Sequence, residues 1–194
     1  MPRHPDLLLE AQILVAAAEL WRKGGEKALT MRAVAQAAHT TTPTVYRRFT
    51  NRQEILRVLL RRIQQDVVKL LQRCQSPQEA SQRYIEFTLS HPHEYELSFA
   101  HEFERFYARR HRCSPAARPQ SPGVELNVKL AEWLGGSPED YGHLSLAFWA
   151  LTHGTSMLLI SKIVRGDLSS ELLSSCEAAV AVLVKNASTF AAAK

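Results

Sequence analysis

Residues 38–49, AHTTTPTVYRRF, bring threonine hydroxyls, a phenol and two guanidinium groups together, and they include no acid. Hydroxyl groups and the amides at a helix N-terminus bind phosphate oxygens, and arginine can form paired hydrogen bonds with guanine. A proline ring or a threonine methyl group can contact the methyl group of thymine. An acid in this stretch would repel the phosphate backbone. The stretch therefore indicates contact with duplex DNA.

The spacing of apolar residues places this stretch on the second of two short helices. Thr30 can cap the first helix, whose inward face includes Val34. Thr41 can cap the second helix, on which Val45 and Phe49 are four residues apart and share one face. That face can pack against the first helix, which leaves the polar side chains exposed. Two short helices joined by a tight turn form a helix-turn-helix, which binds in the major groove.

The excess positive charge of the chain lies in its first third. Residues 1–62 hold 11 Lys and Arg against 5 Asp and Glu, whereas residues 63–194 hold 13 against 14. This asymmetry indicates that one end of the protein meets a polyanion. The alternative is an ordinary helix start within a solvated basic surface. The capped preceding helix and the shared apolar face favour DNA binding.

Clear start and stop signals divide the rest of the chain into helices. The pair Gly24-Gly25 ends the first segment. Asn51 with Glu54 forms a capping pair that opens a long helix. Another helix opens at Ser76 and stops before Pro92, because proline disfavours helical geometry in the residue that precedes it.

The second half of the chain contains similar helix start and stop signals. We expect a helix over about residues 92–110 and a proline-containing loop over 113–121. Ser121 and Ser137 are each followed by proline, the combination that starts a helix. The last segment covers about residues 169–190. No useful length of sequence alternates with a period of two residues, so no sheet is expected.

These signals predict an all-α chain of about nine helices. A three-helix helix-turn-helix domain would occupy residues 1–52, and a helical bundle would occupy residues 53–194. With 194 residues, 45% of them hydrophobic, the chain can bury a core. Its three widely spaced cysteines indicate reduced thiols in a cytoplasmic protein. No apolar run is long enough for a membrane span, and the first residues lack the pattern of a secretory signal.

Residues 13–56 resemble the DNA-binding region of the TetR family of transcriptional regulators and align with its pattern without a gap. Three positions depart from that pattern. His39 stands where glycine is usual, Thr40 where an apolar residue is usual, and Arg52 where lysine is usual. Histidine is among the few other residues that adopt positive φ, so we expect the turn to be kept. The matching positions are Ile13, Leu14, Ala17, Leu20, Trp21, Gly25, Thr30, Val34, Ala35, Ala38, Thr44, Tyr46, Phe49 and Leu56.

The resemblance implies a homodimer that binds a palindromic operator in double-stranded DNA, with repression as the common mode. It also implies release by a small-molecule effector, with no catalytic residue, cofactor or membrane involved. It assigns base contacts to Thr42, Pro43, Thr44 and Arg47, and phosphate contacts to Thr30, Thr41, Tyr46 and Arg52.

The last two long helices are unusually apolar for the outside of a monomer. The resemblance implies that two helices of each subunit form a four-helix dimer interface. The alternative is that these residues belong to the core of their own subunit. The candidate interface residues are Gly154, Met157, Leu158, Val180, Leu183 and Val184.

Aromatic residues in the middle segments are candidates for an effector pocket, which the resemblance implies there. Aromatic residues at helical spacing also occur as plain core. A histidine inside an apolar helix can either contact a ligand or bond to a neighbouring backbone group. The candidate pocket residues are Phe87, Phe103, Phe106, Trp133, Trp149 and His153.

Other classes of function find less support. The residues that could suggest a metal sensor contain no pair with the i, i+4 spacing of helical ligands, so no metal site is expected. Against a helical-bundle enzyme, the sequence contains no GxSxG, HExxH or phosphate-loop motif. A protein-binding adaptor would leave the charge asymmetry unexplained. DNA binding that weakens steeply with salt would exclude both. The metal candidates are His91, His93, His101, His111 and Cys113.

Overall fold

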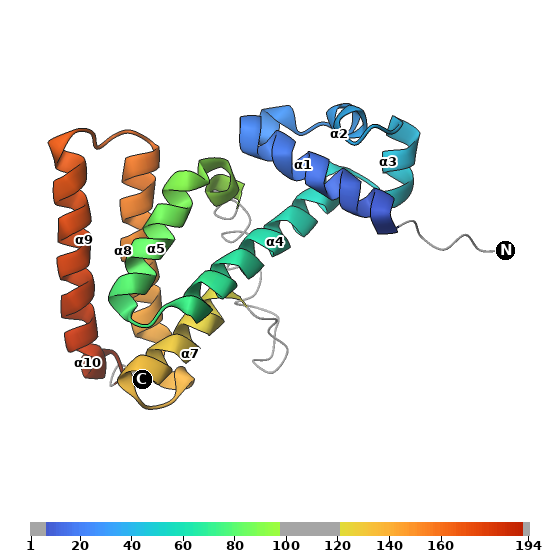
Figure 1. Ribbon diagram of the computed structural model, residues 1–194. Coiled ribbons are helices and arrows are strands. Elements are labelled where there is room, and N and C mark those ends of the chain that lie inside the picture. Colours follow the sequence, from blue (N-terminus) through green and yellow to red (C-terminus); the bar gives the residue numbers. More distant parts are fainter. Residues whose placement is uncertain (1–6, 98–120, 192–194) are drawn as a thin grey trace. The chain divides into compact units, whose positions relative to one another are not determined.

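The computed structural model describes residues 7–97 and 121–191, and these ranges contain helices and no strand (Figure 1). The all-α prediction is therefore confirmed. The helices are α1 (Leu7–Ala28), α2 (Met31–Ala37), α3 (Thr42–Arg48), α4 (Arg52–Arg73), α5 (Pro77–Ser90), α7 (Pro122–Leu134), the 3-10 helix η2 (Pro138–Tyr141), α8 (Gly142–Ile160), α9 (Asp167–Lys185) and α10 (Ala187–Ala191). None of these helices is long and apolar enough to cross a membrane.

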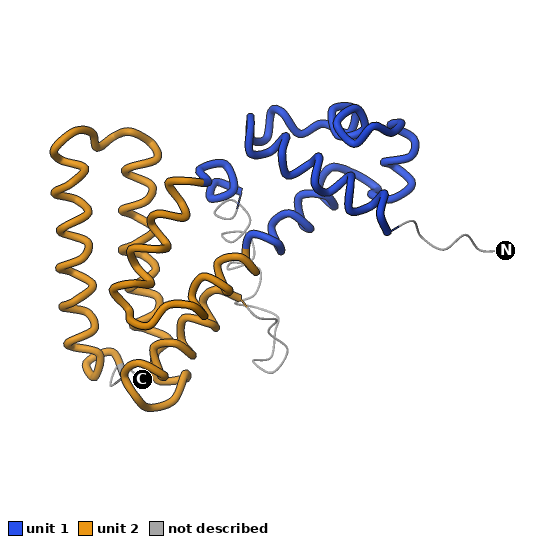
Figure 2. Tube along the Cα trace, viewed as in Figure 1, with its two compact units in different colours: residues 1–63, 91–111 blue, residues 64–90, 112–194 orange. Residues whose placement is uncertain are grey.

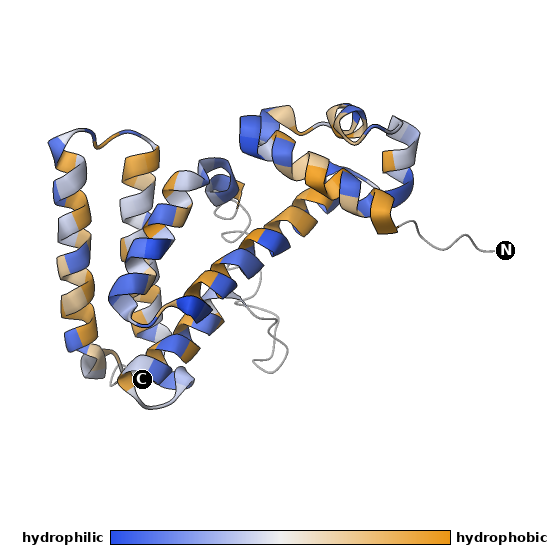
Figure 3. Ribbon diagram, viewed as in Figure 1, coloured by the Kyte–Doolittle hydropathy of each residue, from blue (hydrophilic) through white to orange (hydrophobic). Residues whose placement is uncertain are grey.

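The chain forms two compact units (Figure 2). Unit 1 comprises residues 1–63 and 91–111, and unit 2 comprises residues 64–90 and 112–194. Helix α4 belongs to both, because the division falls after Ile63. It has an apolar side and a hydrophilic side along its length, as expected for a helix that covers a core (Figure 3).

The core of unit 1 holds the two short helices of the predicted helix-turn-helix together. Val34 of α2 and Val45 of α3 are completely buried, as are Ile13 of α1 and Ile55 of α4. Phe49, directly after α3, is 3% exposed. The residues that were expected to face inward therefore do so.

Two of the three side-chain caps predicted at the helix starts of unit 1 are present, and that of Thr41 is not. The Thr30 hydroxyl accepts a hydrogen bond of 3.1 Å from the amide of Ala33. The Asn51 side chain accepts one of 3.0 Å from the amide of Glu54. The Glu54 carboxylate in turn accepts one of 2.6 Å from the amide of Thr50. The Thr30 and Asn51 caps each bind an amide in the first turn, where amides have no partner one turn back in the helix.

Two predicted helix ends are also found. Helix α1 loses helical geometry at Gly24 and Gly25, where φ of Gly25 is 57°, and a last turn then continues to Ala28. Helix α5 ends at Ser90, and helical geometry resumes at residues 92–97. The helix predicted over 92–110 is described only as far as residue 97. Of the loop predicted over 113–121, residues 113–120 lie outside the described residues.

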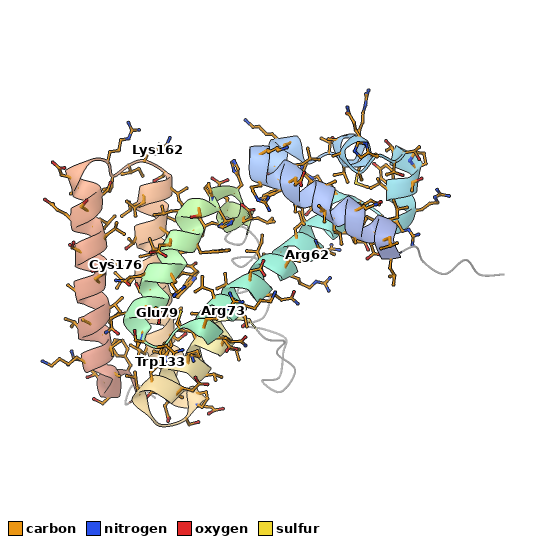
Figure 4. All side chains as sticks on the ribbon, viewed as in Figure 1. Arg62, Arg73, Glu79, Trp133, Lys162 and Cys176 are labelled. Atoms are coloured by element: carbon orange, nitrogen blue, oxygen red, sulfur yellow. The ribbon has the colours of Figure 1, made fainter. Side chains whose placement is uncertain are left out.

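The core of unit 2 lies between α5, α7, α8 and α9. Leu130, Leu144 and Val180 are completely buried there. Cys176 of α9 belongs to this core, and Trp133 of α7 packs against it (Figure 4). The segment predicted as one helix over residues 169–190 is divided into α9 and α10.

The division between α9 and α10 falls at Asn186. Its side chain donates a hydrogen bond of 2.8 Å to the carbonyl of Val182, so it takes an acceptor near the end of α9. Asparagine competes with backbone groups in this way and favours helix ends over helix interiors.

Candidate nucleic-acid interface

Helix α3 presents nearly all of its side chains away from the core. Val45 is its one buried residue. Pro43 lies in the first turn, where its missing N–H costs no hydrogen bond. The Tyr46 side chain is 52% exposed, and Arg47 is also exposed. The helix therefore offers hydroxyl groups, a phenol and a guanidinium group to a partner, with no carboxylate among them.

The turn before α3 has the hydrogen bonds of a Schellman motif. The amide of Thr40 donates to the carbonyl of Ala35 at 2.9 Å, and the amide of His39 donates to the carbonyl of Gln36 at 3.2 Å. His39 adopts φ of 50°. The prediction that the turn is kept with histidine in place of glycine is therefore confirmed.

Three side chains at the exposed side of α3 bond to one another. The hydroxyl groups of Thr41 and Thr44 are 2.9 Å apart, and the Arg47 Nη2 atom donates to the Thr44 hydroxyl at 2.9 Å. The hydroxyl of Thr41 makes no cap of its own, although its carbonyl accepts from the amides of Thr44 and Val45. Arginine has five N–H groups, so Arg47 keeps donors for a further partner.

Two candidate phosphate contacts, Thr30 and Arg52, lie away from α3 and its cap, and they differ in their surroundings. The Thr30 hydroxyl is exposed, and while it accepts from Ala33 it keeps its own proton for a phosphate oxygen. Arg52 instead pairs with Glu26, whose Oε1 atom lies 2.6 Å from its Nη2 atom. Nothing in the local sequence pattern indicated this pair.

Residues 91–97 contact α1 within unit 1, which sequence reasoning also missed. The indole of Trp21 donates a hydrogen bond of 2.6 Å to the carbonyl of His93. Arg22 forms an ion pair of 3.1 Å with Glu94. Gly25 lies so close to the His93 ring that an added Cβ atom would be 3.1 Å from its Nδ1 atom.

The candidate dimer residues fall into two groups in unit 2. Met157 is 38% exposed and Leu158 is 36% exposed. Gly154 is half-buried, and an added Cβ atom there would contact nothing within 4 Å. Val180 is completely buried, so it belongs to the core of its own subunit, and Leu183 and Val184 pack against the same core.

The candidate pocket residues are partly described. Phe87 and Trp133 pack against the core of unit 2, and the Lys129 ammonium lies 5.2 Å from the centre of the Trp133 ring. The rings of Trp149 and His153 stack with centroids 4.9 Å apart. Burial lowers the pKa of His153 to about 4, so its ring is neutral near pH 7. Phe103 and Phe106 lie outside the described residues.

Within the described residues no group of three His, Cys, Asp or Glu could hold a metal ion. Of the metal candidates, His91 lies between α5 and the helical stretch 92–97, and His93 contacts α1. His101, His111 and Cys113 lie outside the described residues.

Two family models match most of the chain. Residues 13–59 match the model described as bacterial regulatory proteins, tetR family. Residues 78–183 match the model described as Tetracyclin repressor-like, C-terminal domain. No curated protein matches the chain.

Solved structures of the same family share the fold at low sequence identity. A TetR variant from Acinetobacter baumannii AYE, in complex with minocycline, is 14% identical with a TM-score of 0.63, over 95% of this chain and 98% of that chain. A tetR-family transcriptional regulator from Streptomyces coelicolor is 14% identical with a TM-score of 0.62, over 96% and 90%. A TetR transcriptional regulator from Rhodococcus sp. RHA1 is 18% identical with a TM-score of 0.57, over 94% and 99%.

The matches cover both the helix-turn-helix unit and the helical unit that follows it. Together with the exposed basic helix α3, they place the protein among DNA-binding regulators. The chain belongs to the TetR family of bacterial transcriptional regulators.

Proposed function

We propose that the protein is a repressor that binds a palindromic operator as a homodimer and leaves it when a small-molecule effector binds. Residues 1–52 would form the DNA-binding part, and residues 53–194 the part for effector binding and dimerisation. The observation that carries the proposal is helix α3, which buries Val45 alone and directs its hydroxyl and guanidinium groups outward.

The exposed side chains of α3 suit the major groove. Thr42, Pro43, Thr44 and Arg47 lie in or after its first turn, where a recognition helix contacts base edges. Arg47 would form paired hydrogen bonds with guanine, and Pro43 would contact the methyl group of thymine. In this proposal phosphate oxygens bind to Thr30, Thr41, Tyr46 and Arg52.

A dimer is supported by the composition and exposure of α8. This helix of 19 residues contains no Lys, Arg, Asp or Glu. One side of it packs into unit 2 through Leu144 and Phe148, yet Met157 and Leu158 on another side remain exposed. A helix that is apolar on more than one side is normally buried on more than one side. We infer that a second subunit covers the exposed side, in a four-helix interface with α9.

An effector in unit 2 would act by favouring one of two states. It can shift the equilibrium only if its affinities for the DNA-bound and free states differ. The neutral His153 ring stacked on Trp149 provides a polar group on an apolar helix for such a ligand. The complex of the Acinetobacter baumannii TetR variant with minocycline supports a small-molecule ligand in this fold.

The direct test is selection of bound duplexes from a random pool at moderate salt. We expect a palindrome with half-sites about 34–36 Å apart between centres, the spacing of successive major grooves on one face of B-DNA. Affinity should fall steeply as salt increases, since bound phosphates release counterions. A monomeric protein that ignores DNA even at low salt would contradict the proposal.

A further inference from the structure

Residues 25–54 of unit 1 contain two acids, Glu26 and Glu54. Glu54 has a local structural role, because its carboxylate accepts a hydrogen bond of 2.6 Å from the amide of Thr50 at the start of α4. The Glu26 carboxylate bonds instead to the guanidinium group of Arg52, 26 positions away. One of the two acids near the candidate DNA-binding surface is thus paired with a residue proposed to bind phosphate.

The pair occupies one edge of the guanidinium group. The Nη2 atom of Arg52 donates to Oε1 of Glu26 at 2.6 Å, and its Nη1 atom donates to the backbone carbonyl of Glu26 at 3.4 Å. The side chain of Arg52 is 33% exposed and that of Glu26 is 68% exposed, so solvent and ions reach both groups. The N–H groups that bond to Glu26, and the positive charge that its carboxylate offsets, are not fully available to a phosphate oxygen.

The position of Glu26 gives the fold little need for its charge. It follows Gly25, where the regular part of α1 has ended. Its side chain is largely exposed, and exposed ion pairs add little to stability. The charge of Glu26 would, however, have a direct effect on a polyanion brought to Arg52, because it cancels the positive charge there and repels phosphate.

We propose that Glu26 sets the affinity of the protein for DNA, because its carboxylate competes with an operator phosphate for the guanidinium group of Arg52. This inference rests on the proposed phosphate contact of Arg52. Binding of DNA opens the ion pair, so the cost of displacing Glu26 offsets part of the free energy gained from the phosphate contact. Because each subunit binds DNA less tightly, the complex dissociates more easily when an effector binds.

The variant Glu26→Gln separates competition by charge from a role in positioning. The glutamine oxygen can still accept a hydrogen bond from Arg52, but the negative charge is removed. We expect the affinity of the dimer for its selected operator to rise by at least about threefold at 0.1 M salt, with a salt slope steeper by up to about one unit per subunit. Glu19→Gln, on the exposed side of the same helix α1, makes the same change of net charge and is the matched control.

The double variant Glu26→Gln/Arg52→Ala tests whether the effect passes through Arg52. We expect the gain from Glu26→Gln to disappear when Arg52 is absent. A gain of equal size in both backgrounds would overturn the inference, since Glu26 would then only repel DNA through space. Circular dichroism and thermal unfolding establish that each variant folds, and Arg52→Gln replaces Arg52→Ala if the latter does not.

The remaining outcomes separate this inference from the proposed function. If the wild-type protein selects an operator but Glu26→Gln leaves binding unchanged or weakens it, the proposed function stands and the inference is overturned. If Glu26→Ala weakens DNA binding and Glu26→Gln does not strengthen it, Glu26 is a positioning residue. That result also overturns the inference. Wild-type protein without affinity for DNA would remove the proposed function and the inference with it.

Discussion

The indole nitrogen of Trp21 donates a hydrogen bond of 2.6 Å to the backbone carbonyl of His93, which lies 72 positions further along the chain. The bond joins α1 to the residues that follow α5. Tyr95 and Leu97 of the same stretch are each 3% exposed, so the contact is packed as well as hydrogen-bonded. Residues 91–97 therefore belong structurally to unit 1, the unit of the helix-turn-helix, although they follow α5 in the sequence.

Replacing Trp21 with phenylalanine should destabilise the protein. The carbonyl of His93 would lose its donor in a largely buried setting, at a cost of about 1–3 kcal/mol including the lost packing. We expect the midpoint of thermal unfolding to fall by roughly 3–10 °C. Lys69→Ala is the control, because both side chains of its ion pair with Asp66 are more than half exposed. That control should change the midpoint little, and equal losses in the two variants would contradict the expectation.

His39→Gly should stabilise the protein. The backbone of His39 has φ of 50°, which glycine adopts without the clash between Cβ and the carbonyl oxygen. After the greater entropy of glycine in the unfolded chain is counted, we expect a gain of about 0.5–1 kcal/mol in the free energy of unfolding. His39→Val should lose at least about 1 kcal/mol, because a β-branched residue is poorly tolerated at positive φ. Urea unfolding measures both changes, and a stable His39→Val variant would show that the turn had changed shape.

The helix boundaries of unit 1 could be predicted because their signals are local. The hydroxyl of Thr30 and the side chain of Asn51 reach amides only three residues away, so the sequence nearby is enough to identify the caps. The turn at His39 is local in the same sense. The Glu26–Arg52 and Trp21–His93 contacts span 26 and 72 positions, and they depend on how the chain returns on itself. No nearby residue could indicate them.

The apolar helices of unit 2 were harder to divide between core and surface. Val180 and Leu158 both lie on helices rich in apolar residues, but Val180 is completely buried and Leu158 is 36% exposed. The periodicity of apolar residues identifies the buried side of a helix that has one apolar side. On a helix that is apolar on several sides, it does not show which side faces the subunit's own core. Packing against neighbouring helices decides this, and it is absent from the sequence of a single helix.

Arg47→Ala should weaken binding to the selected operator far more than binding to random DNA. If Arg47 forms paired hydrogen bonds with guanine, its loss costs about 1–3 kcal/mol per half-site, while the salt dependence stays nearly unchanged. Thr44→Val keeps the shape of the side chain but removes the hydroxyl that accepts from Arg47, so we expect a smaller loss of the same kind. Fluorescence anisotropy with both kinds of duplex provides the comparison. Equal losses on the two DNAs would make Arg47 a phosphate contact.

Leu158→Asp should convert the proposed dimer into monomers. The two-fold symmetry would place a carboxylate from each subunit in the apolar interface, where unpaired charges are costly. We expect the dimer dissociation constant to rise by at least about 100-fold, since like charges facing each other cost several kcal/mol. Sedimentation velocity measures the change, and Leu8→Asp on the exposed side of α1 is the control for a new surface charge. A Leu158→Asp protein that stays dimeric would place the interface elsewhere.

His153 should make the protein less stable as the pH is lowered. Burial lowers the pKa of its ring from 6.5 to about 4. Between these two values the unfolded chain holds the proton and the folded chain does not, so the free energy of unfolding decreases as the pH falls from 6.5 to 4. Allowing for solvent screening, we expect a loss of roughly 1–2 kcal/mol across this range.

His153→Gln should remove this contribution and flatten the dependence of stability on pH. His143→Gln is the matched control, because His143 lies exposed on the same helix α8. Urea midpoints at pH 7, 6, 5 and 4 measure the effect, and the titration of the His153 ring protons by NMR gives the pKa directly. If the wild type and His153→Gln lose stability in parallel down to pH 4, the pKa of the ring must be the same in the folded and the unfolded chain. The ring would then gain its charge below about pH 6.5, and it would favour an anionic ligand beside Trp149 only in acidic solution.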